Sequence, residues 1–368
     1  MENTALQTAA QIAHMAQQAK LAFIDRDAAI QAIALGLVSG EHVILLGPPG
    51  TGKTKLAKWF AKATGQSFFK IELNPDTTRE DLIGPIDPVA LRDGRWDRAW
   101  AGLALCSVAL VDEVGKASSQ VANILLGIME ERTVTSGNLD KPIPLHSLIG
   151  ASNETIDRTS PAIWDRFALR VVVEYLTKPA HFDALLTSAW GDPPSSPLSD
   201  GDFEITRKAC YDMAARASRP VLDKMLQLWS GIANCLTDPV SDRRWMKGLV
   251  IAAAAALLAG RTEIGIQDLI VLKDMLWTKI AERQALEGWL TDMVWSDRRE
   301  LHEISVLLDG LVDELAGKRT LEQVGKVVYR IKRAQQRLES LNTGADDEAL
   351  GALSVRMASM LQTCYDRA

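Results

Sequence analysis

Residues 47–54, with the sequence GPPGTGKT, have the composition and spacing of a loop that binds polyphosphate. The loop follows the apolar run 43–46 and precedes a helical pattern from Lys55 onward, so it joins a buried strand to a helix. Glycine-rich backbone can direct several N–H groups at phosphate oxygens, because no Cβ atoms stand in the way. Lys53 then reaches the β and γ phosphates, and the Thr54 hydroxyl is a ligand of Mg²⁺. The sequence therefore predicts a site for a nucleoside triphosphate with Mg²⁺. The candidate nucleotide-binding residues of the loop are Gly47, Pro48, Pro49, Gly50, Thr51, Gly52, Lys53 and Thr54.

Two carboxylates, Asp112 and Glu113, follow an apolar run further along the chain. Phosphoryl transfer needs a carboxylate near Mg²⁺ and a group that orients the attacking water, because catalysis is mostly positioning and charge neutralisation. We expect Asp112 to lie beside Thr54 as a metal ligand and Glu113 to polarise the water. An ordinary strand end is the alternative interpretation, but the position of the pair after a phosphate loop favours the catalytic one.

A third polar position, Asn153, follows the apolar run 148–152. Its amide would lie next to the two carboxylates, within reach of the γ-phosphate or the attacking water, although Asn at a strand end is also a common turn former. In this order and spacing the three features resemble the AAA+ ATPases, which bind ATP and Mg²⁺. GPPGTGKT corresponds to the Walker A motif, VALVDE to Walker B and Asn153 to sensor 1.

Within that superfamily the sequence resembles the MoxR branch, and RavA-like members in particular. The resemblance rests on residues 82–85 (LIGP), 162–167 (AIWDRF), 241–245 (SDRRW) and 268–274 (DLIVLKD). It extends over roughly residues 5–290 and is weaker at both ends.

The resemblance implies roles for residues that spacing alone does not assign. Arg166 corresponds to the arginine finger, which one subunit extends to the γ-phosphate bound by its neighbour; an ion pair with Asp165 or another carboxylate is the alternative. Arg243 corresponds to the sensor 2 residue, which contacts the nucleotide of its own subunit, and the adjacent Arg244 is the other candidate. Asn74, after the second strand, is a candidate for holding Glu113 in an inactive position.

Short β-branched runs alternate with helical patterns between residues 43 and 175, as is typical of a parallel sheet covered by helices. We expect an α/β fold, an AAA+ core with a five-stranded parallel doubly wound sheet at 1–190. An all-α lid of four helices is expected at 200–285, and a C-terminal helical hairpin or bundle at 286–368, with turns near Gly310, Gly317 and 342–344. The expected strands are 43–46, 68–73, 108–112, 148–152 and 169–174.

Two segments fit the insertions of the MoxR pattern. Residues 76–100 contain a hairpin signal at Asp93 and Gly94 between flanks that bear Trp96 and Trp100, both expected to be exposed. Residues 131–145 would form the hairpin before sensor 1. Plain surface loops are the alternative for both segments.

The composition excludes several classes of protein. A net charge of −6 argues against a constitutive nucleic-acid binder, and the four cysteines include no C-x-x-C pair that would indicate a zinc site. The uncharged run 248–260 is too short to span a bilayer. The first residues have no basic lead before an apolar stretch, so a cytoplasmic location is expected.

The resemblance implies a homo-oligomeric ring, expected to be a hexamer, that uses ATP hydrolysis for chaperone-like remodelling of a partner complex. A von Willebrand factor A domain protein is the implied partner. The compact β insertion of RavA-like members has no counterpart in 286–368, which is short and helical. A nucleic-acid motor and a nucleotide-gated switch are the alternatives, although the first insertion carries no basic strip.

Overall fold

In the computed structural model, the chain forms two compact units, which are described separately. The first comprises Met1–Ala217, Leu236–Ile264 and Val271–Arg283, and the second comprises Ser218–Cys235, Gly265–Ile270 and Gln284–Ala368. The two units do not correspond one to one to the three predicted domains. The division into core, lid and C-terminal region at 1–190, 200–285 and 286–368 stays a prediction. The structure describes residues 2–95, 97–136, 139–153, 161–187, 193, 196–315, 321–339 and 347–366.

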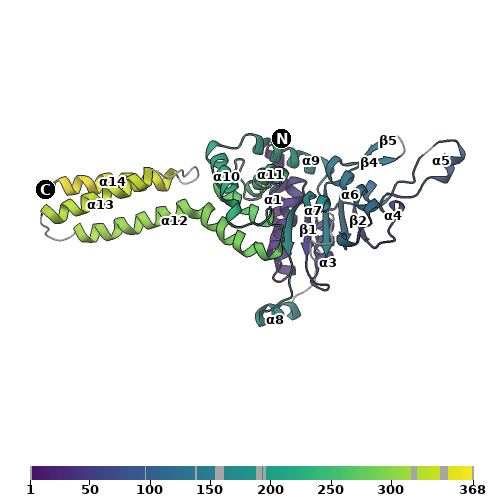
Figure 1. The fold of residues 1–368 in the computed structure, drawn as a ribbon, viewed down its shortest axis with the longest axis horizontal. Helices are drawn as coiled ribbons and strands as arrows, with labels where there is room; N and C mark the ends of the chain where they lie inside the picture. Colours follow the sequence, from purple (N-terminus) through teal and green to yellow (C-terminus); the bar gives the residue numbers. More distant parts are fainter. Residues whose placement is uncertain are drawn as a thin grey trace. The chain divides into compact units, whose positions relative to one another are not determined.

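The centre of the first unit is a sheet of five parallel strands in the order β2-β3-β6-β1-β7 (Figure 1). The strands are β1 (His42–Leu46), β2 (Phe68–Glu72), β3 (Val108–Asp112), β6 (Ser147–Ser152) and β7 (Phe167–Val172). Every residue of β1 is buried, and its apolar run 43–46 is typical of a central parallel strand. The expected α/β fold with five strands is confirmed. The last strand lies two residues earlier than predicted, and the others agree within one residue.

Helices pack against this sheet and against one another. Helix α2 (Asp27–Ser39) contacts β1 and β7, and helix α3 (Lys53–Thr64) contacts β2 and β3. Helix α1 (Glu2–Ala22) packs on α2 together with α9 (Asp200–Ala215) and α11 (Asp242–Leu258). Helix α11 contains the uncharged run 248–260 up to Leu258, and most of that run is buried. None of the helices in the described ranges is both long and apolar enough to cross a membrane.

The fourth predicted lid helix is not an α-helix. Helices α9, α10 (Arg219–Gly231) and α11 are present, but Ile266–Asp274 adopts 3-10 geometry. The Asp268 carboxylate accepts a hydrogen bond from the backbone N–H of Gly265 at 2.8 Å, which caps the start of this segment locally. Its β-branched residues, Ile266, Ile270 and Val271, further disfavour a regular helix.

The two insertions contain short helices and strands and contact each other through Lys141 and Trp100. The first contains the short helices α4 (Arg79–Ile83) and α5 (Pro88–Arg92), with an antiparallel bridge between Ile86 and Arg98. The second is an antiparallel hairpin of β4 (Thr133–Ser136) and β5 (Leu139–Pro142). The Lys141 ammonium lies 4.3 Å from the centre of the Trp100 ring, so Trp100 is half-buried and not exposed as predicted. Trp96 and the hairpin tip at 137–138 lie outside the described residues.

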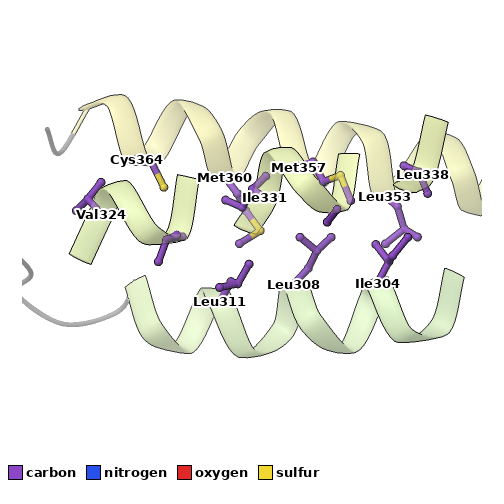
Figure 2. Close-up of a cluster of buried hydrophobic side chains, with 12 residues drawn as sticks. Ile304, Leu308, Leu311, Val324, Ile331, Leu338, Leu353, Met357, Met360 and Cys364 are labelled. Atoms are coloured by element: carbon purple, nitrogen blue, oxygen red, sulfur yellow. The ribbon is translucent and has the colours of Figure 1, made fainter. Parts of the chain in front are cut away.

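The second unit includes a three-helix bundle at the C-terminal end (Figure 2). Its helices are α12 (Arg283–Leu315), α13 (Leu321–Glu339) and α14 (Asp347–Asp366). Helix α12 runs through Gly310, so the turn predicted there is wrong; a helical glycine costs only about 1 kcal/mol, which packing can offset. The turns expected at Gly317 and 342–344 lie outside the described residues. The bundle core consists of Ile304, Leu308, Leu311, Val324, Val327, Ile331, Ala334, Leu338, Leu353, Met357, Met360 and Cys364.

A polar cluster around the buried Glu41 joins α9 and α11 to the turn before β1. Glu41 accepts hydrogen bonds from Lys247 at 2.6 Å and from the Tyr211 hydroxyl at 2.9 Å. Nearby, His146 lies 2.6 Å from the Leu37 carbonyl through Nε2 and packs against the Phe203 ring. Burial, with smaller contributions from nearby arginines, lowers the pKa of His146 to about 3. The imidazole is therefore neutral in the folded protein at any mild pH.

We expect this histidine to make stability pH-dependent. The unfolded chain protonates a histidine near pH 6.5, whereas His146 stays neutral down to about pH 3 when folded. The unfolded state therefore binds more protons in this window, and stability is lost as pH falls from about 6.5 towards 3, by up to ~1.4 kcal/mol per pH unit. His146→Gln should make the change in unfolding free energy between pH 7.5 and 5.5 smaller than in the wild type. The exposed His14→Gln is the control, and equal slopes for His146→Gln and wild type would contradict the assignment.

Candidate nucleotide site

The phosphate loop, residues 47–54, connects β1 to α3 as the sequence predicts. Gly47, Gly50 and Gly52 have φ values of 144°, 81° and 87°, which residues with a Cβ rarely adopt. Gly52 precedes α3 and no side chain caps that helix, so the first N–H groups of α3 have no side-chain acceptor. A phosphate at this position would accept hydrogen bonds from these N–H groups.

Gly47 is the most constrained position of the loop. A Cβ atom there would lie 2.0 Å from the carbonyl oxygen of Val173, and its φ of 144° would add strain. We expect Gly47→Ala to distort the loop and weaken nucleotide binding about 10- to 100-fold, because such strain costs roughly 1–3 kcal/mol. Titration with a fluorescent ATP analogue measures the loss. Gly127→Ala is the matched control, since a Cβ at that position meets no atom within 4 Å; unchanged affinity in Gly47→Ala would contradict the geometry.

Lys53 and Thr54 occupy the positions that phosphate and metal chemistry require. The Lys53 ammonium donates to the carbonyls of Gly47 at 2.6 Å and Pro48 at 2.9 Å, and to Asn153 Oδ1 at 3.1 Å. Burial lowers the pKa of Lys53, and the charges of Asp112 and Glu113 oppose that shift. The Thr54 hydroxyl donates to Asp112 Oδ2 at 3.2 Å, so a hydroxyl and a carboxylate oxygen lie side by side. Hard cations such as Mg²⁺ prefer oxygen ligands of this kind.

Glu113 is buried and held through both carboxylate oxygens. Asn153 Nδ2 donates to Oε1 at 2.5 Å, and the Lys116 ammonium lies 3.4 Å from Oε2. Glu113 has a φ of 55°, which only a minority of residues with side chains adopt. Asn153 thus bridges Lys53 and Glu113. The structure brings these predicted residues together at the carboxyl ends of β1, β3 and β6.

Two details of this region differ from what the sequence suggested. The Asn74 side chain accepts from the N–H of Asp76 at 2.9 Å and so closes its own turn, while Asn153 and Lys116 contact Glu113. The hypothesis that Asn74 holds Glu113 is therefore wrong for this conformation. Sequence reasoning missed Lys116, although its place three residues after Glu113 in a short 3-10 turn was a local signal.

A pocket of about 250 Å³ opens beside the phosphate loop, and sequence reasoning missed it. Its walls come from the segment between α1 and α2, the loop itself, the segment after β7 and α8 (Pro179–Thr187). Arg26 donates to the Thr51 carbonyl at 3.0 Å, and the Tyr175 hydroxyl donates to the Pro49 carbonyl at 3.1 Å. An apolar and aromatic cavity next to a phosphate loop has the chemistry to hold a purine base. The lining residues are Phe23, Ile24, Arg26, Gly50, Thr51, Gly52, Tyr175, Leu176, Phe182 and Leu185.

The predicted arginines form a separate cluster. Arg166, the last residue of α7 (Pro161–Arg166), has its Nε 3.5 Å from Glu130 Oε2. Arg243 Nη1 lies 3.3 Å from the same oxygen and 3.8 Å from Asp165 Oδ2. The alternative interpretation of Arg166, an ion pair with Asp165 or another carboxylate, is met in this structure by Glu130, whereas Asp165 contacts Arg243 and Arg244. Among the described residues, neither arginine has an ion pair or side-chain hydrogen bond with the phosphate loop.

Arg243 and Arg244 differ in their surroundings. The Arg244 side chain is only 7% exposed, and its Nε lies 3.1 Å from Asp165 Oδ1. Its Nη1 donates to Thr278 Oγ1 at 3.2 Å, so it fixes neighbouring segments of the first unit. Arg243 is one-third exposed. Of the two sensor 2 candidates, Arg243 is therefore the one with access to a ligand, but it lies beside Arg166 and not at its own phosphate loop.

Comparison with known proteins places this geometry in a family. Residues 10–197 match the family described as the MoxR domain in the MoxR-vWA-beta-propeller ternary systems, and residues 221–290 match an AAA lid domain. The chain belongs to the MoxR family of AAA+ ATPases. This MoxR-family chain is 28% identical over 299 residues to an uncharacterised protein of Methanocaldococcus jannaschii, which covers 80% of the chain and 77% of that protein. It is 26% identical over 277 residues to the chaperone MoxR1 of Mycobacterium tuberculosis, which covers 70% of the chain and 72% of that protein.

The fold has a counterpart among solved structures. A putative ATPase from Cytophaga hutchinsonii superposes on this MoxR-family chain with a TM-score of 0.64 at 22% identity. The match covers 78% of this chain and 95% of that one. At this identity the likeness supports the AAA+ architecture, whereas the site rests on the residues described above.

Proposed function

We propose that this MoxR-family chain hydrolyses ATP with Mg²⁺ and that it couples hydrolysis to the remodelling of a partner protein complex. One observation carries the proposal: Lys53, Thr54, Asp112, Glu113 and Asn153 converge through direct side-chain contacts. A lysine for phosphate, two oxygen ligands for a cation and a buried carboxylate for water are the groups that phosphoryl transfer to water requires.

Thr54 and Asp112 would hold Mg²⁺, because their oxygens already lie 3.2 Å apart and both are hard ligands. The metal would neutralise charge on the β and γ phosphates. Lys53 now donates to carbonyls of its own loop, and these hydrogen bonds can be exchanged for phosphate oxygens without leaving the ammonium unpaired. Asn153 would then keep Glu113 oriented towards the attacking water.

The pocket beside the loop would take the adenine base. Phe23 and Tyr175 supply aromatic surface, and the backbone of Gly50 to Gly52 joins this pocket to the phosphate site. The sequence motifs predict the site of the phosphates but not that of the base. Together the two regions account for a complete nucleotide.

The arginine cluster supports a ring in which one subunit completes the site of the next. Arg166 and Arg243 form ion pairs with Glu130 and, in the described residues, none with their own phosphate loop. Met246, one helical turn after Arg243, is 70% exposed. A large exposed apolar side chain beside two arginines fits a contact with a neighbouring copy. We propose that both arginines act on the neighbour's γ-phosphate, which revises the expectation that Arg243 contacts its own nucleotide. A hexamer stays the proposed size.

The partner is proposed from the family description alone. That description names MoxR domains in ternary systems with a von Willebrand factor A domain and a β-propeller, so a protein with a von Willebrand factor A domain is the proposed partner. The RavA-like subtype and the cytoplasmic location remain predictions. The sequence of the first insertion has no basic strip, which argues against nucleic acid as the substrate.

Purified protein should release phosphate from ATP, and chelation of Mg²⁺ or the change Lys53→Ala should abolish the release. Lys53→Ala loses its phosphate contacts, whereas Lys58→Ala on the same helix changes an exposed lysine and is the control. Tight ATP binding without phosphate release under all conditions would contradict sustained hydrolysis and favour a nucleotide-gated switch. Stimulation of turnover by DNA or RNA would instead favour a nucleic-acid motor.

A further inference from the structure

The Glu130 carboxylate is the point on which Arg166 and Arg243, both partly exposed, converge. It lies in the last turn of α6 (Ser119–Glu131), while Arg166 ends α7 and Arg243 begins α11. The Nε of Arg166 and the Nη1 of Arg243 lie 3.5 Å and 3.3 Å from the same Oε2 atom. Three elements distant in sequence therefore meet at one carboxylate oxygen. The Glu130 side chain is 40% exposed, so this group lies at the surface of the first unit.

The second carboxylate of the cluster cannot replace Glu130. Asp165 Oδ1 accepts from the Ser241 hydroxyl at 2.8 Å and lies 3.1 Å from Arg244 Nε. Its Oδ2 atom reaches Arg243 only at 3.8 Å. Asp165 therefore mainly neutralises the buried Arg244. Without Glu130, Arg166 would lose the carboxylate with which it forms an ion pair in the described residues, and its positive charge would lie beside that of Arg243.

We propose that Glu130 is a positioning residue that holds Arg166 and Arg243 as a pair for the nucleotide of the neighbouring subunit. This inference rests on the proposed function, in which both arginines act across a subunit contact. Glu130 neutralises one of the two positive charges. The two guanidinium groups can therefore lie close together before they contact the nucleotide of the neighbouring subunit. Glu130 also fixes two long side chains in advance, so these side chains lose less conformational entropy when the transition state forms. The remaining positive charge is free to favour the γ-phosphate.

A mixture of two inactive variants tests this role, because in the mixture only one kind of subunit can supply arginines and only the other kind can hydrolyse ATP. Acceptor subunits carry Arg166→Ala and keep an intact nucleotide site, and donor subunits carry Glu113→Gln and keep their arginines. Turnover in the mixture arises from acceptor sites that donors complete. Glu130→Gln is then introduced either into the donor or into the acceptor, and kcat and KM for ATP are measured at a fixed ratio.

We expect Glu130→Gln in the donor to lower the kcat of the mixture about three- to tenfold with little change in KM, since partly exposed ion pairs contribute modestly. In the acceptor, whose Arg166 is already absent, the same change should have little effect. A structural role would lower activity equally from either side. Glu131→Gln in the donor is the matched control, because its carboxylate contacts Thr133 and no arginine.

The outcomes separate this inference from the proposed function. Equal kcat for donors with and without Glu130→Gln, or equal losses from donor and acceptor, would overturn the role of Glu130 alone. A mixture without turnover, even with Glu130 intact in both subunits, would contradict the completion of sites between subunits and with it the proposed function.

Discussion

Replacement of Glu113 by Gln is expected to lower ATP turnover by about 10²- to 10⁴-fold, the usual contribution of a group that takes up a proton in the transition state. Glutamine keeps the size of the side chain and can still accept from Asn153, so the loop and the metal ligands should remain in place. Affinity for ATP should therefore be retained. Phosphate release and binding of a fluorescent ATP analogue, measured on the same protein, separate the two effects.

The control for Glu113→Gln is Glu204→Gln, which makes the same chemical change at an exposed position of α9. Its turnover should equal that of the wild type. If Glu113→Gln hydrolysed ATP at the wild-type rate, another group would have to orient the water, and the assignment of Glu113 would be refuted.

Replacement of Arg166 by Ala is expected to lower turnover by about 10³- to 10⁵-fold, the range found where arginine fingers stabilise transferred phosphoryl groups. Arg166 contacts Glu130 and the Ala162 carbonyl but not the phosphate loop of its own subunit. ATP affinity of isolated subunits should consequently be unchanged. Single-turnover hydrolysis at saturating ATP measures the loss at the chemical step.

Arg219→Ala is the matched control for Arg166→Ala. Arg219 is 78% exposed and pairs with Asp223 on its own helix, so its removal should leave turnover unaltered. Full activity of Arg166→Ala would show that its guanidinium takes no part in hydrolysis. A large loss of ATP affinity would instead indicate a role within its own subunit.

The groups that lie close together in sequence, or at the ends of neighbouring strands, could be predicted. The phosphate loop is a contiguous motif, and Asp112 and Asn153 follow apolar runs that form adjacent parallel strands. Because the carboxyl ends of such strands meet at one edge of the sheet, their convergence follows from the pattern alone. Because Glu113 follows Asp112 directly in the sequence, the predicted position of Asp112 also gives that of Glu113.

Long-range placement could not be predicted in the same way. The pocket beside the phosphate loop combines the segment after α1 with Tyr175 and Phe182, and no periodicity links segments so far apart. The contact of Arg243 with Glu130 depends on how α11 packs within the first unit, which motif spacing does not encode. Glycine often ends helices, so Gly310 predicts a turn, but the packing of α12, α13 and α14 overrides that local preference.

The most direct test of completion between subunits is ATP turnover per subunit as a function of protein concentration. If Arg166 and Arg243 act on a neighbour's nucleotide, turnover per subunit should rise steeply as subunits assemble and then reach a plateau, while Arg166→Ala stays low throughout. Adding Arg166→Ala to wild-type protein at the plateau should lower turnover beyond simple dilution. Turnover per subunit that is constant from the lowest to the highest concentration, with assembly demonstrated in parallel, would contradict the account.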